Sequence, residues 1–336
     1  QLYVLEGCGI KVSSVELIHT NHVYMRSEGE IDWQAMLVRA DIELQTRDLL
    51  CKVKETVPRL FSVLAESETP YIYADKTLCN NPYRCDYFDH CMAAKPDDWA
   101  GLLYRIHSNR LAALHSQGIE SIPDIPEDFQ LPEKQAIALD CIASGEIWVS
   151  DDLKDAILRF GPPAYYMDFE TTAPGIPIYV DTRPYETVPF QFSVHYMNDD
   201  GALSHTAYLA EGDRHPGREF AEELIKAMDR TDIPVVVYNQ SFELGVLDAL
   251  RQMFPDLADG IGAIMENVVD LLPLVRDHVC HPGFITKRSL NAGTYSIKNV
   301  LPALVPSMSY ANLEGVAEGG EASRVFAAIA HGAYTG

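Results

Sequence analysis

Two carboxylates, separated by one aromatic residue, close an apolar run near the middle of the chain. Asp168 and Glu170 flank Phe169 directly after the apolar residues 164–167. Residues two apart in a strand point to the same face, so a strand here would place both carboxylates together and turn Phe169 into the core. Carboxylates roughly 6–7 Å apart on one face repel each other unless a cation lies between them, and Mg²⁺ or Mn²⁺ takes such oxygen ligands. The alternative is a strand end whose acids face water.

A second acidic segment follows the apolar run 235–238. Asn239 comes directly after this run, where a helix N-cap belongs, and Glu243 lies one turn later. An ordinary N-cap, with an acid favoured by the helix dipole, is one interpretation. However, ligands gather at the carboxyl ends of strands in an α/β sheet, and both acidic segments occupy such ends. We therefore predict that Asp168, Glu170 and Glu243 share one metal-binding site.

A third acid, Asp270, follows the apolar step 268–269. It could be a further metal ligand or a residue that caps the next helix. We favour the capping role for Asp270.

Three of the seven cysteines cluster. Cys79, Cys85 and Cys91 are spaced six residues apart in a short, turn-rich segment. Thiolates grouped in this way suit zinc or an iron–sulfur cluster, and either centre needs four ligands as a rule. Candidates for the fourth ligand are His90, Cys8 and Cys51. The alternative is three half-buried thiols. The odd number of cysteines, without a secretory signal, argues against a disulfide framework.

The composition predicts hydrophobic cores and a soluble, cytoplasmic protein. Its 336 residues are 47% hydrophobic, which is enough for two domains. No apolar stretch approaches the roughly 18–20 residues that span a bilayer, and no signal-peptide pattern opens the chain, so we expect no membrane partner. The chain begins at Gln1 and stops at Gly336 after a helical-looking segment, which leads us to expect a fragment of a larger protein.

The chain is strongly acidic. Its net charge of −23 and pI near 4.7 repel phosphate backbones at long range, which argues against broad, non-specific nucleic-acid binding. The same charge is compatible with an enzyme whose acids are matched by metal ions. It is also compatible with an ordinary acidic surface.

The first 120 residues are expected to form short strands and long helices. Two short strands are predicted within 10–27, a long amphipathic helix over 32–66 that Pro58 kinks or splits, and another helix over 97–117. The residues expected to share the apolar face of this last helix are Leu102, Leu103, Ile106, Leu111 and Leu114.

The rest of the chain is expected to form an α/β layered domain after a connection. The Pro- and acid-rich stretch 122–132 is the best linker candidate, within a connecting region of 121–160 that also holds a helix at 132–144. Strands then alternate with helices through 161–336, which favours the α/β class. After the strand that carries Asp168, the expected strands are 190–196, 204–209 and 234–238, and the expected helices are 218–228 and 242–253.

The two acidic segments resemble motifs of a known enzyme family. Asp168-x-Glu170 and Asn239-x-x-Phe242-Glu243 are similar to the first two motifs of ribonuclease-H-like, DnaQ-type 3′-to-5′ exonucleases. The resemblance implies a ribonuclease-H-like mixed sheet with flanking helices, in which four acids bind two metal ions. This chain departs from the family by having Glu243 in place of Asp, which is one methylene longer.

The last motif of that family is missing. It consists of a Tyr or His followed four or five residues later by Asp, and it has no match before Gly336. The fourth ligand and the general base are therefore expected beyond the end of this chain.

Several blocks together resemble a bacterial domain-of-unknown-function family found in RecB-like nucleases. These blocks are 166–171, 176–179, 183–185, 188–195, 238–243 and 296–302. In such proteins a RecB-type PD-(D/E)xK nuclease module, with a cysteine-ligated iron–sulfur cluster, precedes the exonuclease-like domain. Residues 1–92 resemble the tail of that module. The resemblance makes Cys79, Cys85 and Cys91 ligands of a 4Fe-4S cluster, with zinc as the alternative. The first cluster cysteine and the Asp…Glu-x-Lys residues would precede Gln1.

The same blocks point to residues that would contact a nucleic acid, either DNA or RNA. Asn239, Arg183, His195 and Lys298 are the expected substrate-binding groups. His195 on an alternating strand could instead be a structural histidine, and Lys298 an exposed surface lysine. The sequence thus predicts a metal-dependent nuclease. The alternative is a catalytically inactive scaffold that binds nucleic acid or protein and contains a structural metal cluster.

Overall fold

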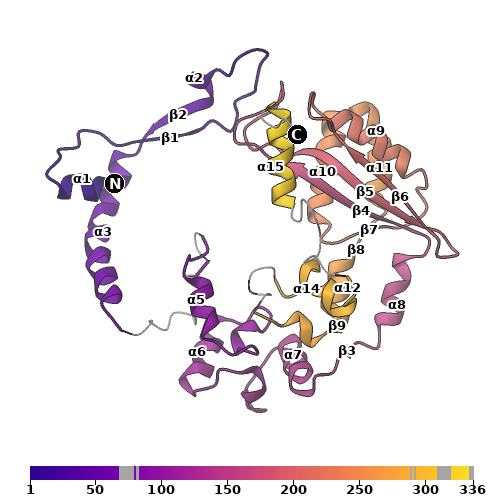
Figure 1. Cartoon of the computed structure of the whole chain (residues 1–336), viewed down its shortest axis with the longest axis horizontal. Coiled ribbons are helices and arrows are strands. Elements are labelled where there is room, and N and C mark those ends of the chain that lie inside the picture. Colours follow the sequence, from indigo (N-terminus) through magenta and orange to yellow (C-terminus); the bar gives the residue numbers. More distant parts are fainter. Residues whose placement is uncertain (68–78, 81–82, 288–289, 291–292, 309–318, 333–336) are drawn as a thin grey trace.

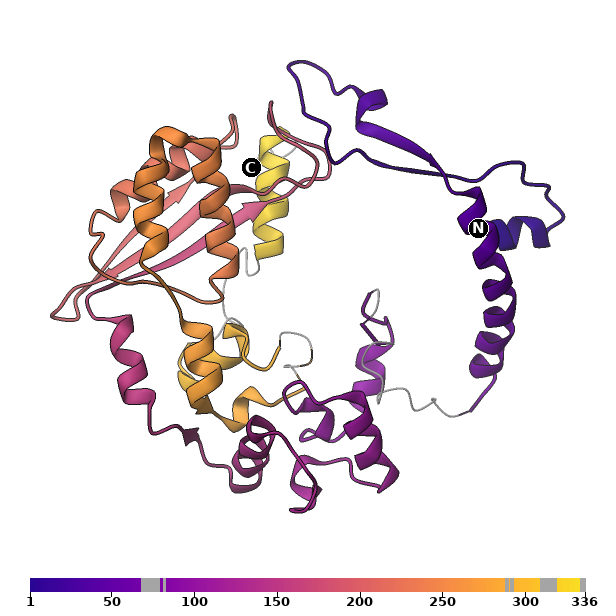
Figure 2. The same ribbon diagram turned by 180° about the vertical axis from the view of Figure 1, so that it is seen from behind.

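The computed structural model describes residues 1–67, 79–80, 83–287, 290, 293–308 and 319–332. A mixed sheet with helices on both faces forms one part of the ribbon, and shorter helices form a second part (Figure 1). The N-terminal segment curves away from both, and the view from behind shows the same arrangement (Figure 2).

The N-terminal segment consists of a two-stranded antiparallel sheet with helices at its two ends (Figure 1). Strand pairing runs from Glu16↔Asp41 to Thr20↔Leu37. Within residues 1–67, all of which the structure describes, the buried hydrophobic side chains are Leu2, Tyr24 and Met36, so this segment has almost no core of its own. Its elements are α1 (Leu2–Gly7), β1 (Glu16–Thr20), α2 (Trp33–Met36), β2 (Leu37–Asp41) and α3 (Glu43–Leu64).

The single helix predicted over 32–66 is wrong. The carboxylate of Asp32 caps the short α2, and the chain then extends as β2 to pair with β1. Asp41 ends β2, and its side chain accepts the N–H of Glu43, where α3 begins. Long-range strand pairing therefore overrides the helical spacing of the first ten residues. Pro58 lies inside α3, which continues beyond it to Leu64.

The second short strand predicted within 10–27 does not form. Instead, the backbone of Arg26 pairs with a distant segment: its N–H donates to the carbonyl of Thr182 (3.0 Å), and the N–H of Asp181 donates to the Arg26 carbonyl (2.8 Å). The Arg26 guanidinium also donates to the carbonyl of Pro177. These bonds attach the N-terminal segment to residues 177–182.

The middle of the chain forms short helices around a hydrophobic core. That core gathers buried side chains from 79–142 and also from 275–300, so two distant segments build it together. The elements are α5 (Phe88–Ala93), η1 (Ala100–Leu102), α6 (Ser108–Ser116), η2 (Ile122–Asp124), α7 (Glu133–Ser144), β3 (Trp148–Val149), α8 (Leu153–Ile157) and η3 (Leu158–Phe160).

The helix predicted over 97–117 forms only in its second half, as α6. The N–H of Ala100 donates to the carbonyl of Glu120 (2.7 Å), and Arg105 adopts a positive φ of 52°, so the first half cannot continue as a helix. The five apolar residues predicted to share a face are nevertheless all buried. The periodicity therefore identified the core residues but not their backbone conformation.

The stretch 122–132, predicted as a linker, begins inside the core. Ile122 is 0% and Ile125 is 5% exposed, and both belong to the core that α7 helps to form. The helix predicted at 132–144 is confirmed as α7. The prolines of this stretch therefore shape a packed turn, and the chain does not leave the core at this point.

The C-terminal half contains a five-stranded mixed sheet with the order β6-β5-β4-β7-β8 among the described residues. β4 and β6 flank β5 antiparallel, whereas β7 pairs parallel with both β4 and β8. The predicted α/β class is confirmed. The elements are β4 (Ala164–Thr172), β5 (Val188–Met197), β6 (Leu203–Leu209), α9 (Gly217–Ala227), β7 (Val235–Val237), α10 (Ser241–Met253), η4 (Pro255–Leu257), α11 (Ala258–Glu266), β8 (Val268–Asp270), α12 (Leu271–His278), β9 (Val279–Cys280), η5 (Pro282–Phe284), α14 (Ile297–Leu304) and α15 (Gly319–Ala330).

The two faces of this sheet are covered differently. One face packs on α9, α10 and α11 and holds Met167 and Phe169 in a hydrophobic core. The other face is covered in part by α12 and by α15, whose Phe326 stacks on Phe190 with ring centroids 4.2 Å apart. Because side chains alternate along a strand, Asp168 and Glu170 share this second face, as predicted.

Among the helices that the structure describes, none has the length and apolar character needed to cross a membrane.

Candidate functional site

Asp168 and Glu170 lie on β4 where that strand outruns its parallel neighbour. The β4–β7 ladder pairs Tyr165 and Tyr166 with β7 and does not reach Asp168. On the other side, β5 continues alongside, and Asp168 pairs with Ser193. One edge of β4 is therefore open beside the two carboxylates.

The surroundings of these carboxylates disfavour negative charge. Asp168 keeps an exposed side chain, but neighbouring atoms displace enough water that desolvation raises its pKa. The pKa of the half-buried Glu170 is also raised, first by desolvation and then by the charge of Asp168, while Lys298 lowers it. The two acids thus repel each other, as the sequence predicted, and Lys298 offsets part of this repulsion.

Glu243 is the most strongly perturbed acid of the site. It lies in the first turn of α10 and is 4% exposed, and its Oε2 has no hydrogen-bond partner among the described residues. Its pKa is raised to about 7, first by burial and then by the charges of Asp168 and Asp270. A buried carboxylate oxygen without a partner costs free energy unless a proton or a cation satisfies it. Glu243 therefore provides the physical indication of a cation position.

The fit of a hard divalent cation depends on how many ligands the chain offers. In the described ranges, no group of three or more His, Cys, Asp or Glu side chains is close enough to hold a metal ion. Mg²⁺ is commonly held by one or two carboxylates, with waters and substrate phosphates as its other ligands. Asp168 and Glu243 meet that smaller requirement, since they are oxygen donors whose charges act on each other. The donor set therefore fits Mg²⁺ or Mn²⁺.

Asp270 caps a helix and also holds the loop that precedes Glu243. Its side chain accepts the N–H of Leu272 at the start of α12 and the N–H groups of Asn239 (2.8 Å) and Gln240 (3.2 Å). The capping interpretation of Asp270 is confirmed. These bonds tie the end of β7 to β8 and so fix where α10, with Glu243, begins.

Asn239 is not the N-cap that the sequence predicts. The N-cap of α10 is Gln240, which makes no side-chain capping bond. Asn239 instead has a φ of 72°, in the left-handed region, and its side chain is exposed. The loop is held by the Asp270 carboxylate, which accepts the backbone N–H of Asn239. Asparagine tolerates this conformation better than most residues, which accounts for its presence here.

We expect Asn239→Gly to keep the stability of the protein and Asn239→Ala to lower the free energy of unfolding by about 1 kcal/mol, because alanine is strained at positive φ. Urea denaturation of both variants measures this. If Asn239 also contacts substrate, the glycine variant should fold normally and bind it more weakly. Equal stability of the two variants would contradict the backbone role.

The other predicted binding residues lie at different places. Lys298, in the first turn of α14, is near enough to Glu170 to lower its pKa, so it belongs to the site. His195 of β5 lies on the same face as Asp168, two residue pairs along the β4–β5 ladder. Arg183, in contrast, is exposed, and its Nε donates to the sulfur of Met25 in the N-terminal segment (3.1 Å). The structure therefore gathers Lys298 and His195 with the carboxylates and leaves Arg183 outside.

A cavity of about 410 Å³ lies against the carboxylate face of the sheet. This volume is in the range of small-molecule sites. Its lining includes Tyr166, Asp168, Ser193, His195, Tyr238 and Ile297. The hydroxyl of Tyr238 donates to the carbonyl of Tyr295, which anchors the wall that α14 forms. The cavity thus places Asp168 beside aromatic and apolar side chains.

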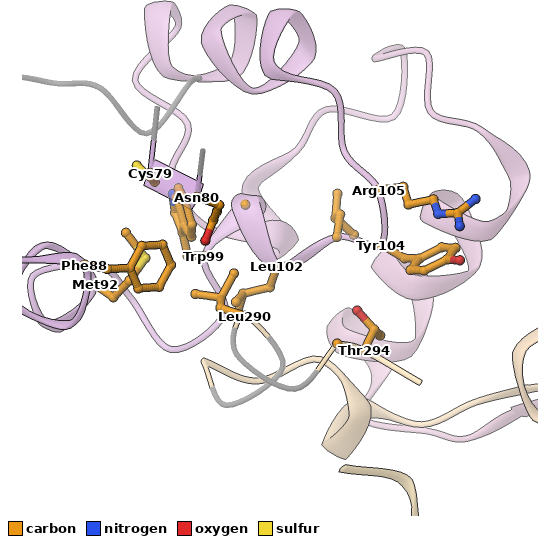
Figure 3. A pocket seen from close by; sticks show the side chains of 13 residues that line it. Cys79, Asn80, Phe88, Met92, Trp99, Leu102, Tyr104, Arg105, Leu290 and Thr294 are labelled. Carbon is orange, nitrogen blue, oxygen red and sulfur yellow. The ribbon is translucent and has the colours of Figure 1, made fainter. Parts of the chain in front are cut away.

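The three clustered cysteines lie at the hydrophobic core that residues 79–142 and 275–300 build together. Cys79 is buried, Cys85 and Cys91 are half-buried, and the N–H of Cys85 donates to the Cys79 carbonyl (2.8 Å). A second cavity of about 290 Å³ borders Cys79 and is lined largely by apolar and aromatic side chains. Figure 3 shows Cys79 at one end and Arg105 at the other. As placed, the three thiols do not converge on one metal position in the described part of the chain.

The sequence did not identify Ser193 and His205 as members of the site. Ser193 pairs with Asp168, and its hydroxyl lies 3.0 Å from Nε2 of His205 on β6. Neither residue belongs to an acidic or a cysteine motif. The alternation of 190–196 and 204–209 predicted the strands, but the register that brings these side chains to Asp168 depends on three-dimensional pairing.

Comparison with known proteins gives one match. Residues 165–289, less than half of the chain, match a family model described as Domain of unknown function (DUF2779). The predicted resemblance to a domain-of-unknown-function family is thereby confirmed. The match includes Asp168, Glu170, Glu243 and Asp270, and Lys298 lies beyond it. No curated protein and no solved structure matches this chain.

Proposed function

We propose that the sheet region carries a metal-dependent phosphodiesterase site that acts as a 3′-to-5′ exonuclease on DNA or RNA. The observation that carries the proposal is Glu243, a buried carboxylate whose Oε2 is unpartnered among the described residues and which faces the charge of Asp168. The sequence resemblance to ribonuclease-H-like exonucleases supplies the reaction class. We also propose that residues 1–92 are the tail of a RecB-type nuclease module.

Each residue of the site has a definable task. Asp168 and Glu243 would hold Mg²⁺ or Mn²⁺, with Glu170 beside them; when bound, such ions activate a water and stabilise the leaving oxygen of a phosphodiester. The pKa of Glu243 lies at about 7, so this carboxyl must release a proton before it can accept a cation. Lys298 supplies positive charge for a phosphate next to Glu170. The apolar cavity wall would exclude water from the far side of the substrate.

The test is direct. The protein is incubated with a 5′-labelled single-stranded oligonucleotide and Mn²⁺ or Mg²⁺, and the products are separated by length. We expect a ladder of fragments that shorten from the 3′ end and that vanish with EDTA. An intact oligonucleotide under every metal condition, from a protein that is folded by circular dichroism, would reject the enzymatic proposal.

An inactive scaffold is the second candidate. The longer Glu243 in place of aspartate and the net charge of −23 favour it. In that case the protein would bind a partner without shortening it. Retained binding of the oligonucleotide together with complete absence of cleavage would support the scaffold over the enzyme.

We also propose that Cys79, Cys85 and Cys91 ligate a 4Fe-4S cluster. Protein prepared without oxygen is expected to be brown, to absorb near roughly 400 nm and to contain iron. Cys85→Ser should lose that iron, whereas Cys51→Ser, at an exposed position in α3, should keep it. A colourless wild-type protein that contains zinc would contradict the iron assignment.

A further inference from the structure

Three rings form one row across the second face of the sheet. The ladders pair Tyr166 of β4 with His195 of β5, and His195 with His205 of β6. The two imidazole rings stack with centroids 4.3 Å apart and planes 25° from parallel. Tyr166 and His195 line the 410 Å³ cavity, whereas His205 is exposed on the edge strand. The row therefore leads from the cavity to the rim of the sheet.

A hydrogen bond holds the outer ring in place. The Ser193 hydroxyl lies 3.0 Å from Nε2 of His205, and Ser193 is itself the ladder partner of Asp168. The stacked position of His205 is thus restrained by a residue that also borders the carboxylates. The row and the acidic site form one continuous surface.

The outer part of this surface is exposed. Leu203 and Leu209 flank His205 on the same face of β6 and are 59% and 66% exposed. Phe190 and Phe326 cover a different part of the sheet, near the start of β5. A row of rings whose outer member, His205, is exposed beside apolar neighbours suits planar ligands that stack.

The negative charge of the protein favours contact of this row with the bases of a nucleic acid over contact with its phosphates. With a net charge of −23, binding through many phosphate contacts is disfavoured. Stacking of bases on aromatic rings needs no net positive charge, and it accepts every base because each has a flat face. Bases in a duplex are already stacked and paired, so a single strand is the form that can use such a row.

We propose that Tyr166, His195 and His205 bind the bases of a single nucleic-acid strand whose terminal phosphodiester lies at Asp168 and Glu243. This inference rests on the proposed nuclease function and specifies its substrate as an unpaired end. His205 acts here as a stacking residue that positions the strand and takes no part in the chemistry.

The experiment compares three replacements of His205 in the full chain. Binding of a fluorescein-labelled hexathymidylate is followed by fluorescence anisotropy with Ca²⁺ in place of Mn²⁺, so that cleavage does not interfere. His205→Ala should weaken binding roughly 5-fold or more, the loss of one stacked base. His205→Phe should restore it, and His205→Lys should not. Thr206→Ala, on the same strand but the opposite face, serves as the matched control and should bind like wild type.

A second measurement separates this inference from the function on which it rests. Hydrolysis of bis(p-nitrophenyl) phosphate with Mn²⁺ reports on the carboxylates without any bases to stack. If wild type hydrolyses this ester and His205→Ala binds the oligonucleotide like wild type, the stacking row is rejected and the nuclease function stands. Rescue by lysine but not by phenylalanine would also overturn stacking, in favour of a phosphate contact. If wild type neither hydrolyses the ester nor binds the oligonucleotide, both proposals fall.

Discussion

Asp168→Asn is expected to abolish metal-dependent cleavage and to leave the protein at least as stable as wild type. The variant keeps the shape of the side chain but removes one charge from the pair that would hold the cation. Metal ions contribute several kcal/mol to phosphodiester cleavage, so the rate should fall by about 100-fold or more. Stability should not fall, because the Asp168 charge raises the pKa of both Glu170 and Glu243 and its removal relieves that repulsion.

The combination of lost activity and preserved stability is what distinguishes a ligand from a structural acid. Asp199→Asn, in the turn between β5 and β6, is the matched control, since it removes an equal charge from an exposed position away from the cavity. That variant should cleave like wild type. Rates are measured on the labelled oligonucleotide and melting temperatures by circular dichroism. An Asp168→Asn variant that cleaves normally would remove the central ligand from the proposal.

Glu243→Gln is expected to stabilise the metal-free protein above pH 7. The folded-state pKa of Glu243 is about 7, above its ordinary value of 4.5, so between these values the folded protein binds more protons than the unfolded chain. The free energy of unfolding therefore falls as the pH rises from about 4.5 to about 7, and the full penalty, on the order of 3 kcal/mol, remains above that range. Glutamine carries no charge and should remove this pH dependence.

Metal should offset the destabilisation by the ionised Glu243 carboxylate, and only in the wild-type protein. A cation that binds the Glu243 carboxylate stabilises the folded state, and its affinity should decline below pH 7 as the carboxyl takes up a proton. Urea denaturation at pH 5 and pH 8, with and without Mn²⁺, measures both quantities. Glu266→Gln, at the exposed end of α11, should behave like wild type throughout. If Mn²⁺ stabilises Glu243→Gln as much as it does wild type, Glu243 is not a ligand.

The fold was predictable where local pattern and tertiary environment agree. β4, β5, β6 and α7 lie where alternation or helical spacing placed them. The failures have tertiary causes. Residues 37–41 have helical spacing but pair with β1, and Ala100 is drawn out of a helix by its bond to Glu120. Neither partner is adjacent in sequence, so a local pattern could not reveal them.

The candidate site was predictable in its acids but not in its neighbours. Asp168 follows the apolar run 164–167 inside β4, and Glu243 comes shortly after the buried strand β7, a pattern that a single sequence can show. That Asp270 would bind the loop of Asn239 depends on β7 lying beside β8, and that His205 would stack on His195 depends on the register of β5 with β6. One-residue shifts in register would turn these side chains to the other face.

The core shared by 79–142 and 275–300 has a consequence for how the chain acquires its structure. The Cys141 thiol donates to the carbonyl of Cys280, a contact that spans 139 positions of sequence. Contacts of such separation close late, because a long loop must be immobilised before they stabilise anything. During synthesis, the short helices α5 to α7 would leave the ribosome well before residues 275–300. Their apolar surface would be exposed to water in the meantime. Until residue 300 is made, this apolar surface lacks the side chains that cover it in the folded protein, and uncovered surface of this kind favours aggregation.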